Sequence, residues 1–434
     1  MTIANFLKDK GYFTKLIGKW HLGHNYTLPT DRGFDSFFGL PYSHEEGFPG
    51  PQPEDLVSSF FFFFDDHNYQ PQKHFMFLGQ TFFFFFGMPC AKPQKKKKKK
   101  EQPVNLSTLT PRYNDEVIEF LTNMSSSDRR FLLYMAYEQP HVPLFVSPGY
   151  NNRSRRGLYG DSVQEMDSSI GLVISTLERL GMINNTLIIV SSDNGAWVNP
   201  SSGMPHPTVT YTFDGGSNAP FRGGKGSTWE GGIHVPAIMW YPAQIPPKSL
   251  CMSPITNMDI LPTLAEWLNF SLPTDRTYDG VSVLSHLLNP SQCSNSTNDP
   301  RQYVYYWRDH LLYAVRYKGY KAHYITRPGF GMEPPIRHDP PLLYNIEWDP
   351  AESVELNTSL PEYQQILQII DSAKTKNEND VYSDMGPALF DQSSYRVVPC
   401  CDKGYNVTQA IEFWKQDDDA GLALWDECVC NYKP

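Results

Sequence analysis

An alternation of apolar strands and amphipathic helices constrains the fold of this chain more than any other feature. Residues Phe131 to Ala136 form a continuous apolar run, and Thr186 to Ser192 is a second run rich in β-branched residues. Between them, Gly160 to Leu180 carries apolar residues at the helical period. Strands that are apolar on both faces are covered by helices on both sides. The order therefore predicts an α/β domain with a mostly parallel central sheet.

A second pattern begins near residue 300. Aromatic, partly alternating runs over Tyr303 to Trp307 and Leu312 to Ile325 predict antiparallel strands, with a hairpin turn at Lys318 and Gly319. We expect an α/β domain over residues 1–300 and a smaller antiparallel β domain with a cysteine-rich tail over residues 301–434. Shorter patterns predict helices at Ile3 to Lys10, Asp115 to Leu121 and Met258 to Leu268, and a buried strand at Ala237 to Tyr241.

Residues 51–102 lack periodicity and are expected to be an irregular insert. They contain the phenylalanine runs Phe60 to Phe64 and Phe82 to Phe86 and the lysine run Lys95 to Lys100. Runs of phenylalanine and lysine correspond to repeated T and A in a coding strand, so we interpret this segment as inserted sequence. Neither apolar run approaches the roughly 20 residues that span a bilayer, and we expect no membrane span.

The net charge argues against a nucleic-acid partner. The formal charge is -10, and it becomes -16 when the six lysines of Lys95 to Lys100 are set aside. Binding to a phosphate backbone requires basic faces that displace counterions. We therefore expect no nucleic-acid partner.

The cysteines and glycosylation sequons indicate the secretory route. Of the seven cysteines, all except Cys90 lie outside the irregular segment. Disulfides are favoured over a zinc site because the tail has no C-x-x-C spacing. Sequons for N-glycosylation occur at Asn25, Asn105, Asn123, Asn152, Asn184, Asn269, Asn295, Asn357 and Asn406. Met1 leads into an amphipathic helix and not into a signal peptide, so we expect a lysosomal or secreted protein that lacks its beginning.

The segment Gly11 to Gly23 is the strongest local motif. It places Lys19 and His21 two residues apart, so both side chains share a face if the segment is extended. A cation and an imidazole on one face suit an anionic ester, because lysine holds charge and histidine moves a proton. The alternative is a solvated lysine beside a structural histidine.

Three further loops carry polar groups that a parallel sheet gathers at one edge. Asp193 and Asn194 directly follow the apolar run Thr186 to Ser192 and offer hard oxygens suited to calcium or magnesium. An Asn-Gly turn is the alternative there. Lys225 lies in the glycine-rich segment Phe221 to Gly232, which is a candidate oxyanion loop or a flexible loop. His141 follows the strand Phe131 to Ala136, where a lone histidine is more often structural.

The motifs together resemble the type I sulfatases, most closely the arylsulfatase A type and next the galactosamine-6-sulfatase type. The matching segments are Gly11 to Gly23, Pro41 to Glu45, Gln139 to Phe145, Ser191 to Gly195, Gly223 to Gly232, Asp259 to Leu264, Tyr320 to Thr326, His338 to Tyr344 and the Cys400-Cys401 pair. The resemblance implies an alkaline-phosphatase-like α/β sandwich with a C-terminal antiparallel sheet. It implies that His21 is catalytic and that Asp193 and Asn194 supply half of the calcium ligands. The implied sulfate-binding residues are Lys19, Ser43, His141 and Lys225.

The printed chain departs from this family at the nucleophile. The family uses a formylglycine made from the cysteine of a C-x-P-S-R motif, and two further paired aspartates bind calcium. No such motif occurs here, because Cys90 is followed by Ala91, Lys92 and Pro93. We therefore expect a sulfuric ester hydrolase whose full-length form is active, whereas the chain as printed is inactive and binds calcium weakly.

Two other functions fit the same residues. One alternative is a non-catalytic relative that binds sulfated glycans, and another is a metal-dependent phosphatase or phosphodiesterase of the same fold. The expected substrate is a sulfated small molecule, lipid or glycan, and the chain is a possible homo-oligomer.

Overall fold

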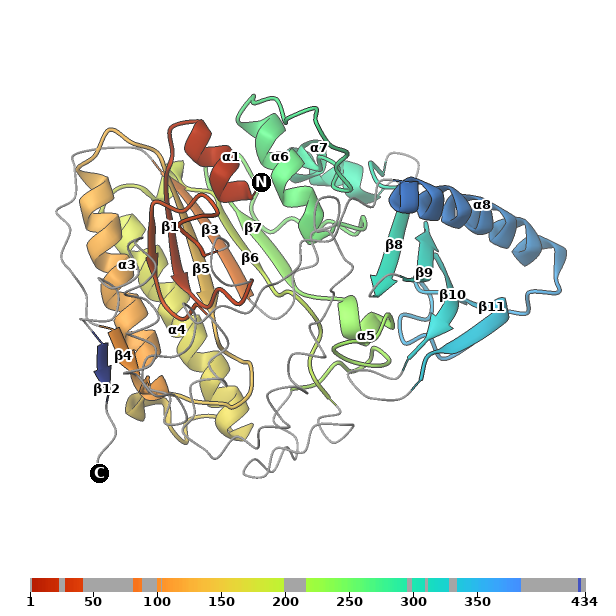
Figure 1. Cartoon of the computed structure of the whole chain (residues 1–434), viewed down its shortest axis with the longest axis horizontal. Coiled ribbons are helices and arrows are strands. Elements are labelled where there is room, and N and C mark those ends of the chain that lie inside the picture. The colour runs from red at the N-terminus through yellow and green to blue at the C-terminus, as the bar shows by residue number, and fades with distance from the viewer. Residues whose placement is uncertain are drawn as a thin grey trace, which may run out of the picture. The chain divides into compact units, whose positions relative to one another are not determined.

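The computed structural model describes ten segments of the chain in two compact units. These segments are residues 2–22, 28–41, 81–87, 100–102, 104–198, 216–294, 299–308, 311–327, 334–383 and 428–430. The main part of the first unit ends at Leu187, and the main part of the second begins at Ile188. The expected domain boundary near residue 300 stays a prediction. Figure 1 labels the helices and strands.

Three parallel strands organise the first unit. They are β1 (Phe13–Gly18), β2 (Ser36–Phe38) and β5 (Phe131–Tyr137). The central strand β1 pairs with β2 on one side and with β5 on the other, in register from Phe13 opposite Phe131 to Gly18 opposite Ala136. All seven residues of β5 are buried, as the apolar sequence requires. The expected parallel sheet is thus confirmed.

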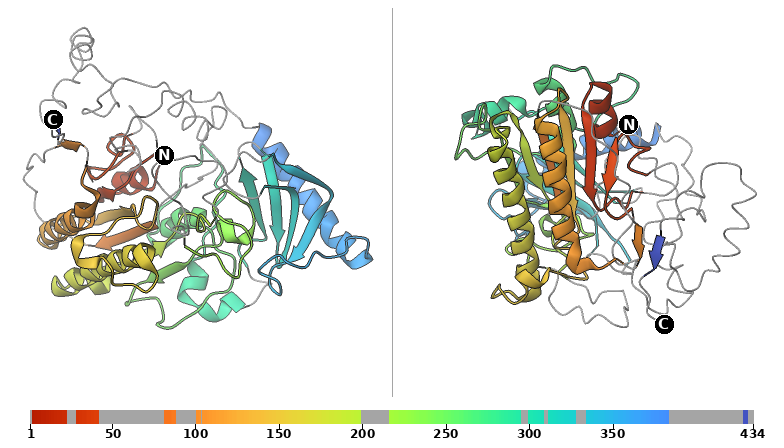
Figure 2. Two further views of the ribbon diagram at one scale, coloured as in Figure 1. Left: turned by 90° about the horizontal axis from the view of Figure 1, so that it is seen from below. Right: turned by 90° about the vertical axis from the view of Figure 1, so that its left-hand side faces the viewer.

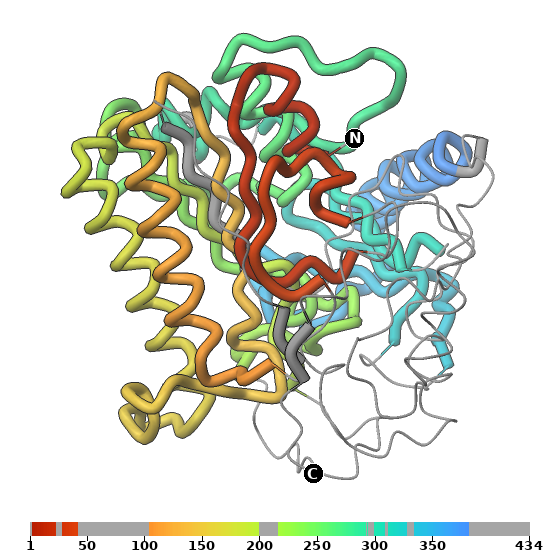
Figure 3. The backbone as a smooth tube through the Cα atoms, turned by 60° about the vertical axis from the view of Figure 1, so that its left-hand side comes forward, coloured from red at the N-terminus to blue at the C-terminus, as the bar shows by residue number. Residues whose placement is uncertain are grey.

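The N-terminal helix α1 (Ile3–Asp9) leads into β1. Thr2 caps it, because its side chain accepts from the backbone N–H of Asn5 while the Asn5 side chain accepts from the backbone N–H of Thr2. Beyond the helix, Gly11 has a φ of 86°, a backbone conformation that glycine adopts without strain. Figure 3 shows α1 beside β1 at the N-terminal end of the chain. The expected first helix is therefore present with the expected stop.

Two long helices, α3 (Leu109–Ser125) and α4 (Gly157–Arg179), lie side by side against the strands of the first unit (Figure 2). The ring of Phe120 in α3 packs edge-on against Phe131 of β5, with centroids 5.5 Å apart. The hydroxyl of Tyr137 in β5 lies 2.6 Å from Ser169 Oγ in α4. Both helices expected in these regions are present, and both contact β5.

Part of the segment expected to be irregular is regular in the structure. Thr81–Gly87 forms the strand β3, and Lys100–Gln102 forms β4, which pairs in parallel with β12 (Cys428–Cys430). Aromatic residues have a high propensity for strands, so a run of phenylalanines can form a strand even though apolar and polar residues do not alternate in it. The other residues of 51–102 lie outside the described part of the chain.

The second unit begins with β6 (Ile188–Ser191), which pairs antiparallel with β7 (Ala237–Trp240). The sequence predicts that β7 is buried, and this expectation is wrong, because its first two residues are exposed and its last two are only half-buried. Ile238 is 61% exposed. A run of four apolar residues carries no periodicity that tells a covered strand from one with an open face.

A four-stranded antiparallel sheet forms the C-terminal part of the second unit. Its order is β11-β10-β9-β8, and Lys318, with a φ of 53°, makes the turn between β9 and β10. The long helix α8 lies along one side of this sheet (Figure 1). Leu367 and Ile370 of α8 pack with Val315 and Ala322 in the core beneath it. The strands are β8 (Tyr303–Arg308), β9 (Leu311–Tyr317), β10 (Tyr320–Thr326) and β11 (Ile336–Asn345), and α8 spans Pro361–Ser383.

Shorter elements connect these parts. They are α5 (Glu230–Ile233), α6 (Ile260–Trp267), α7 (Leu284–Leu288) and the 3-10 turns η3 (Leu106–Thr108), η4 (Pro148–Tyr150), η5 (Ile183–Asn185), η6 (Asn257–Asp259) and η7 (Pro290–Ser294). The α6 helix confirms the helical pattern expected near residue 260. Within the described segments, no helix is both long and apolar enough to cross a membrane.

Candidate functional site

The loop after β1 holds the first two candidate residues. Lys19 is buried, with 1% of its surface exposed, and its backbone N–H donates to the carbonyl of Ala136 at 2.8 Å. His21 has a φ of 47°, and its N–H donates to the carbonyl of Pro41 at 3.2 Å. The extended conformation therefore ends before His21. The two-residue spacing is then no evidence that the side chains of Lys19 and His21 lie on the same face. A left-handed conformation at a non-glycine residue stores strain, which is common at functional sites.

A glycine fixes the position of Lys19. Gly18 has a φ of 117°, and a Cβ added there would lie 1.9 Å from the carbonyl oxygen of Ala136. No other residue type fits between β1 and β5 at this point. The close backbone contact sets where the chain leaves β1 and delivers Lys19 to the carboxyl end of the parallel strands.

The loop after β5 adds a histidine and a buried carboxyl group. The backbone N–H of His141 donates to the carbonyl of Glu138 at 2.8 Å, and its ring Nδ1 lies 2.6 Å from the carbonyl of Val142. Because a carbonyl only accepts, Nδ1 is the donor in this contact. Burial raises the pKa of Glu138 to about 7, against a hydrogen bond from Tyr113 and the charge of Lys19, both of which lower it. No pattern in the sequence distinguishes Glu138.

The candidate metal ligands lie just beyond β6 in the second unit. Asn194 donates from Nδ2 to the carbonyl of Gly195 at 2.9 Å. Its Oδ1 is buried and has no hydrogen-bond partner among the described residues. A buried carbonyl oxygen of this kind fits a hard cation such as calcium. The neighbouring Asp193 accepts from the hydroxyl of Ser192 at 3.4 Å, so this donor set fits part of a calcium site.

Lys225 belongs to the same local cluster as Asp193 and Asn194. The backbone N–H of Lys225 donates to the carbonyl of Ala196 at 3.0 Å, and the N–H of Gly195 donates to the carbonyl of Gly232 at 2.9 Å. The side chain of Asn218 bonds to both the N–H and the carbonyl of Ala196. These bonds connect the glycine-rich loop to the segment that holds Asp193 and Asn194. They favour an ordered loop over the flexible loop that was the alternative from the sequence.

The loop is also anchored to the antiparallel sheet through buried charges. Lys321 of β10, with none of its side chain exposed, lies 2.8 Å from Glu230 Oε1 and 3.3 Å from Glu352 Oε1. His323 Nε2 donates to Glu352 at 2.6 Å, and Glu352 accepts from the backbone N–H of Glu230, also at 2.6 Å. Burial acts to raise the pKa of Glu230, but Lys321 and His234 together lower it to about 2. We call Glu230, Lys321, His323 and Glu352 the buried charge cluster.

The buried charge cluster was not found from the sequence. Its members come from α5, β10 and the turn after β11, and they look like scattered charges in the chain. Burial lowers the pKa of His323 to about 4, against the Glu352 hydrogen bond, so His323 is neutral near pH 7. A usable signal was the presence of a lysine and a histidine inside the apolar strand Tyr320 to Ile325.

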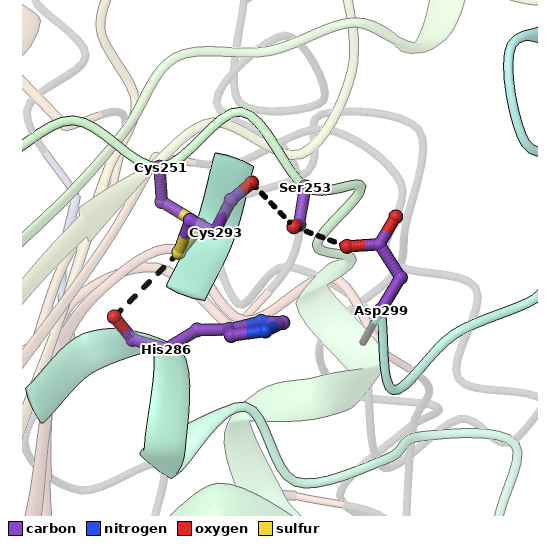
Figure 4. The surroundings of a disulfide bond; sticks show 5 residues. All are labelled: Cys251, Ser253, His286, Cys293 and Asp299. Atoms are coloured by element: carbon purple, nitrogen blue, oxygen red, sulfur yellow. Dashed lines mark hydrogen bonds between the residues drawn. A yellow bond between two sulfur atoms is a disulfide. The ribbon is translucent and has the colours of Figure 1, made fainter. Parts of the chain in front are cut away.

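A disulfide joins Cys251 and Cys293 in the second unit (Figure 4). Ser253 Oγ donates to the carbonyl of Cys293 at 3.0 Å, and Asp299 accepts from the same hydroxyl. The sequence predicts disulfides but not which cysteines pair, and the structure pairs Cys251 with Cys293. Of the tail cysteines, the structure describes only the backbone of Cys428 to Cys430.

Removing this disulfide is expected to cost about 4 kcal/mol of unfolding free energy, because the bond closes a loop in the unfolded chain. The two cysteines are 42 residues apart. The double replacement of Cys251 and Cys293 by serine tests this in chemical denaturation, with Met252→Ala as the control. Met252 is 73% exposed and should tolerate the change. An unchanged denaturation midpoint in the double variant would contradict a bridge between these cysteines.

The structure brings the candidate residues into two groups, one in each unit. Lys19, His21 and His141 follow the adjacent strands β1 and β5, whereas Asp193, Asn194 and Lys225 share one hydrogen-bonded cluster. Ser43 lies outside the described residues.

Residues 1–270 match the family described as Sulfatase, and residues 299–409 match the C-terminal region of aryl-sulfatase. This chain belongs to the sulfatase family. The family is one of enzymes that hydrolyse sulfuric esters, so the expected family and enzyme class are confirmed. The match over more than half of the chain follows the same segments that carry the candidate residues.

Known sulfatases support this assignment along most of the chain. Arylsulfatase G of Rattus norvegicus is 33% identical over 420 residues, which cover 94% of this sulfatase and 76% of the relative. N-acetylgalactosamine-6-sulfatase of Canis lupus familiaris is 30% identical over 84% of this chain and 66% of its own length. The crystal structure of PsFucS1 sulfatase from Pseudoalteromonas sp. has a TM-score of 0.67 at 24% identity, covering 90% of this chain and 74% of that one. The sulfatase fold is confirmed, whereas relatives of different sulfatase types match at similar identity and leave the type open.

Proposed function

We propose that this sulfatase chain binds the sulfate group of a sulfated aryl, lipid or glycan ester. Lys19 and Lys225 supply positive charge, and His141 and Ser43 supply further contacts. The observation that carries the proposal is the burial of the Lys19 ammonium at the carboxyl end of β1, where only 1% of the residue is exposed. A buried cation is stabilised by anionic groups, and a sulfate oxyanion is one such group.

His21 is the proposed acid–base residue of the reaction. Its backbone conformation, with a φ of 47°, is one that a protein retains only where surrounding contacts enforce it. The bond from its N–H to the carbonyl of Pro41 is one such contact. An imidazole held in this way moves a proton at a fixed place as the ester is cleaved.

Asp193 and Asn194 are the proposed calcium ligands of the chain. When bound, calcium would add positive charge beside the sulfate oxygens. The buried Oδ1 of Asn194 supports this role. Calcium takes roughly six to eight oxygens, and the further paired aspartates implied by the resemblance have no counterpart in the printed sequence. We expect weak calcium binding by these 434 residues.

The printed chain is expected to bind sulfate esters without hydrolysing them. No C-x-P-S-R motif occurs in its 434 residues, so no formylglycine is available to attack sulfur. A chromogenic aryl sulfate tests this, with His21→Ala as the comparison. Metal-dependent turnover by the unmodified chain above the His21→Ala level would overturn the expectation. Fusion to an in-frame segment carrying C-x-P-S-R is expected to give turnover, and continued inactivity would favour a sulfated-glycan-binding role.

We also propose a lysosomal or secreted location for this protein. The disulfide between Cys251 and Cys293 supports it, because such bonds persist in oxidising compartments. Further support comes from the glycosylation sequons, since every sequon asparagine in the described segments is exposed. These asparagines are Asn105, Asn123, Asn152, Asn184, Asn269 and Asn357.

A further inference from the structure

Lys19 and Glu138 leave two adjacent parallel strands at the same end. Gly18 and Ala136 are register partners of β1 and β5, and Lys19 donates its N–H to the carbonyl of Ala136. Glu138 lies one residue beyond the end of β5. Each of the two residues is 1% exposed. Both residues are therefore buried at the end of these strands where the sulfatase chain is proposed to receive its substrate.

Only one oxygen of the Glu138 carboxyl group has a hydrogen-bond partner among the side chains that the structure describes. Its Oε1 accepts from the hydroxyl of Tyr113 in α3 at 2.6 Å. Its Oε2 is buried and has no hydrogen-bond partner among the described residues. A buried carboxylate in this state is stabilised by a nearby cation or by taking up a proton. Lys19 provides the cation, because its charge acts on Glu138.

The ionised and protonated forms of Glu138 are nearly equal in free energy near neutral pH. Burial raises its pKa to about 7, whereas Tyr113 and Lys19 act in the opposite direction. Burial and Glu138 raise the pKa of Tyr113 well above its ordinary value, so Tyr113 remains a donor and Glu138 is the group that titrates. The titratable or charged groups around this site are Arg112 and Tyr113 of α3, Lys19 after β1, Tyr137 of β5, His141 in the following loop and Glu165 of α4, which contacts Gln139.

We propose that Glu138 is a positioning residue that controls the charge offered by Lys19, and that an oxyanion binding at Lys19 does so with uptake of one proton by Glu138. This inference rests on the proposed role of Lys19 in sulfate binding. An ionised Glu138 neutralises Lys19 and repels a second anion. A protonated Glu138 removes one negative charge from the surroundings of Lys19 and so favours the oxyanion, and by linkage the bound oxyanion stabilises that proton.

Proton-coupled binding makes a quantitative prediction for inorganic sulfate. Above the pKa of Glu138, the affinity should fall up to about tenfold per pH unit, because each binding event must supply one proton. Glu138→Gln carries no charge at any pH, so its sulfate affinity should stay nearly constant between pH 7 and 8.5. At pH 8.5 this variant should bind sulfate more than tenfold more tightly than the unmodified chain.

Calorimetric titration of the full 434-residue chain with sodium sulfate measures the proton directly. Two buffers of equal pH and different ionisation enthalpy should give an uptake near one proton per sulfate at pH 8. The uptake should vanish in Glu138→Gln and persist in Asp115→Asn, a matched acid-to-amide change at an exposed position of the same unit. Uptake that persists in Glu138→Gln would assign the proton to a histidine and overturn the inference.

A carboxyl NMR titration covers the case in which Glu138→Gln does not fold. The Glu138 carboxyl should titrate near neutral pH in the free protein, and Lys19→Met should move its midpoint upward. A midpoint that does not respond to Lys19→Met would overturn the pairing. Sulfate binding that depends on Lys19 but takes up no proton contradicts only this inference. No sulfate binding by the unmodified chain between pH 5 and 8.5 would contradict the proposed function and this inference together.

Discussion

Replacing Lys321 with methionine is expected to lower the free energy of unfolding by about 3 to 5 kcal/mol, the usual cost of removing one partner from a buried ion pair. Lys321 has none of its side chain exposed and contacts both Glu230 and Glu352. Methionine has a similar length but no charge, so two carboxylates would remain in the interior without their cation. Chemical denaturation at pH 7 measures the loss.

The pH dependence of this loss separates charge from packing. The pKa of Glu230 is about 2 in the folded protein against an ordinary value of 4.5. The stability that Glu230 contributes is therefore present above pH 4.5 and is lost as the pH falls toward 2. Without Lys321 this contribution disappears, so the difference between variant and unmodified chain should shrink from pH 7 to pH 3.

A matched control for Lys321→Met is Lys318→Met in the same hairpin. Lys318 is exposed at the turn between β9 and β10, so its replacement should change the unfolding free energy by less than about 1 kcal/mol. The double variant Lys321→Met with Glu230→Gln should recover part of the loss, because it removes one uncompensated charge. Equal, pH-independent losses for Lys321→Met and Lys318→Met would show that the buried charge cluster has no role in stability.

The Gly18→Ala variant is expected to lose about 4 kcal/mol of stability and most of its capacity to bind sulfate. A left-handed backbone costs an L-residue about 1 to 2 kcal/mol, and forcing an extra group into a packed site costs about 1 to 3 kcal/mol more. Here the added Cβ lies 1.9 Å from the Ala136 oxygen. Relief of this clash must separate β1 from β5 and displace Lys19. Thermal unfolding and sulfate titration measure the two effects.

Gly171→Ala is the control for this glycine. Gly171 lies in α4, has open space around an added Cβ, and has no positive φ. Alanine there should stabilise the helix by up to about 1 kcal/mol. If Gly18→Ala behaved like Gly171→Ala, the close approach of β1 and β5 would not determine the position of Lys19.

The regular elements could be predicted because their patterns are local. The run Phe131 to Ala136 and the helix over Gly160 to Leu180 each repeat apolar residues at the period of one element, and β5 and α4 follow them. The exposure of Ile238 could not be predicted, because a run of four apolar residues occurs both in strands that are covered on two faces and in strands with one open face. Strand β3 was missed because the segment was interpreted from composition and not from propensity.

For the candidate site, the sequence supplied residues but not their surroundings. Lys19 was found from its spacing to His21 in the segment Gly11 to Gly23, and His141 was found because it follows a predicted strand, whose carboxyl end is where ligands gather in a parallel sheet. Their roles, with those of Ser43, Asp193, Asn194 and Lys225, stay predictions. Glu138 was missed because a single glutamate after a strand has no distinctive pattern, although Tyr113 and Lys19 surround it in the folded chain.

By itself, the sequence determined several strands and helices, among them β5 and α4, together with the sulfatase motifs and the absence of the nucleophile motif from these 434 residues. Only the tertiary structure decided which charges are buried and which groups face them. Lys321 meets Glu230 across 91 residues, and Glu352 accepts from the N–H of Glu230 across 122. Periodicity reports the exposure of one element at a time. Burial of a charge depends on several elements that meet only when the chain folds. This burial shifts the pKa values of Glu138 and His323, and the charges that face Glu230 lower its pKa against the effect of burial.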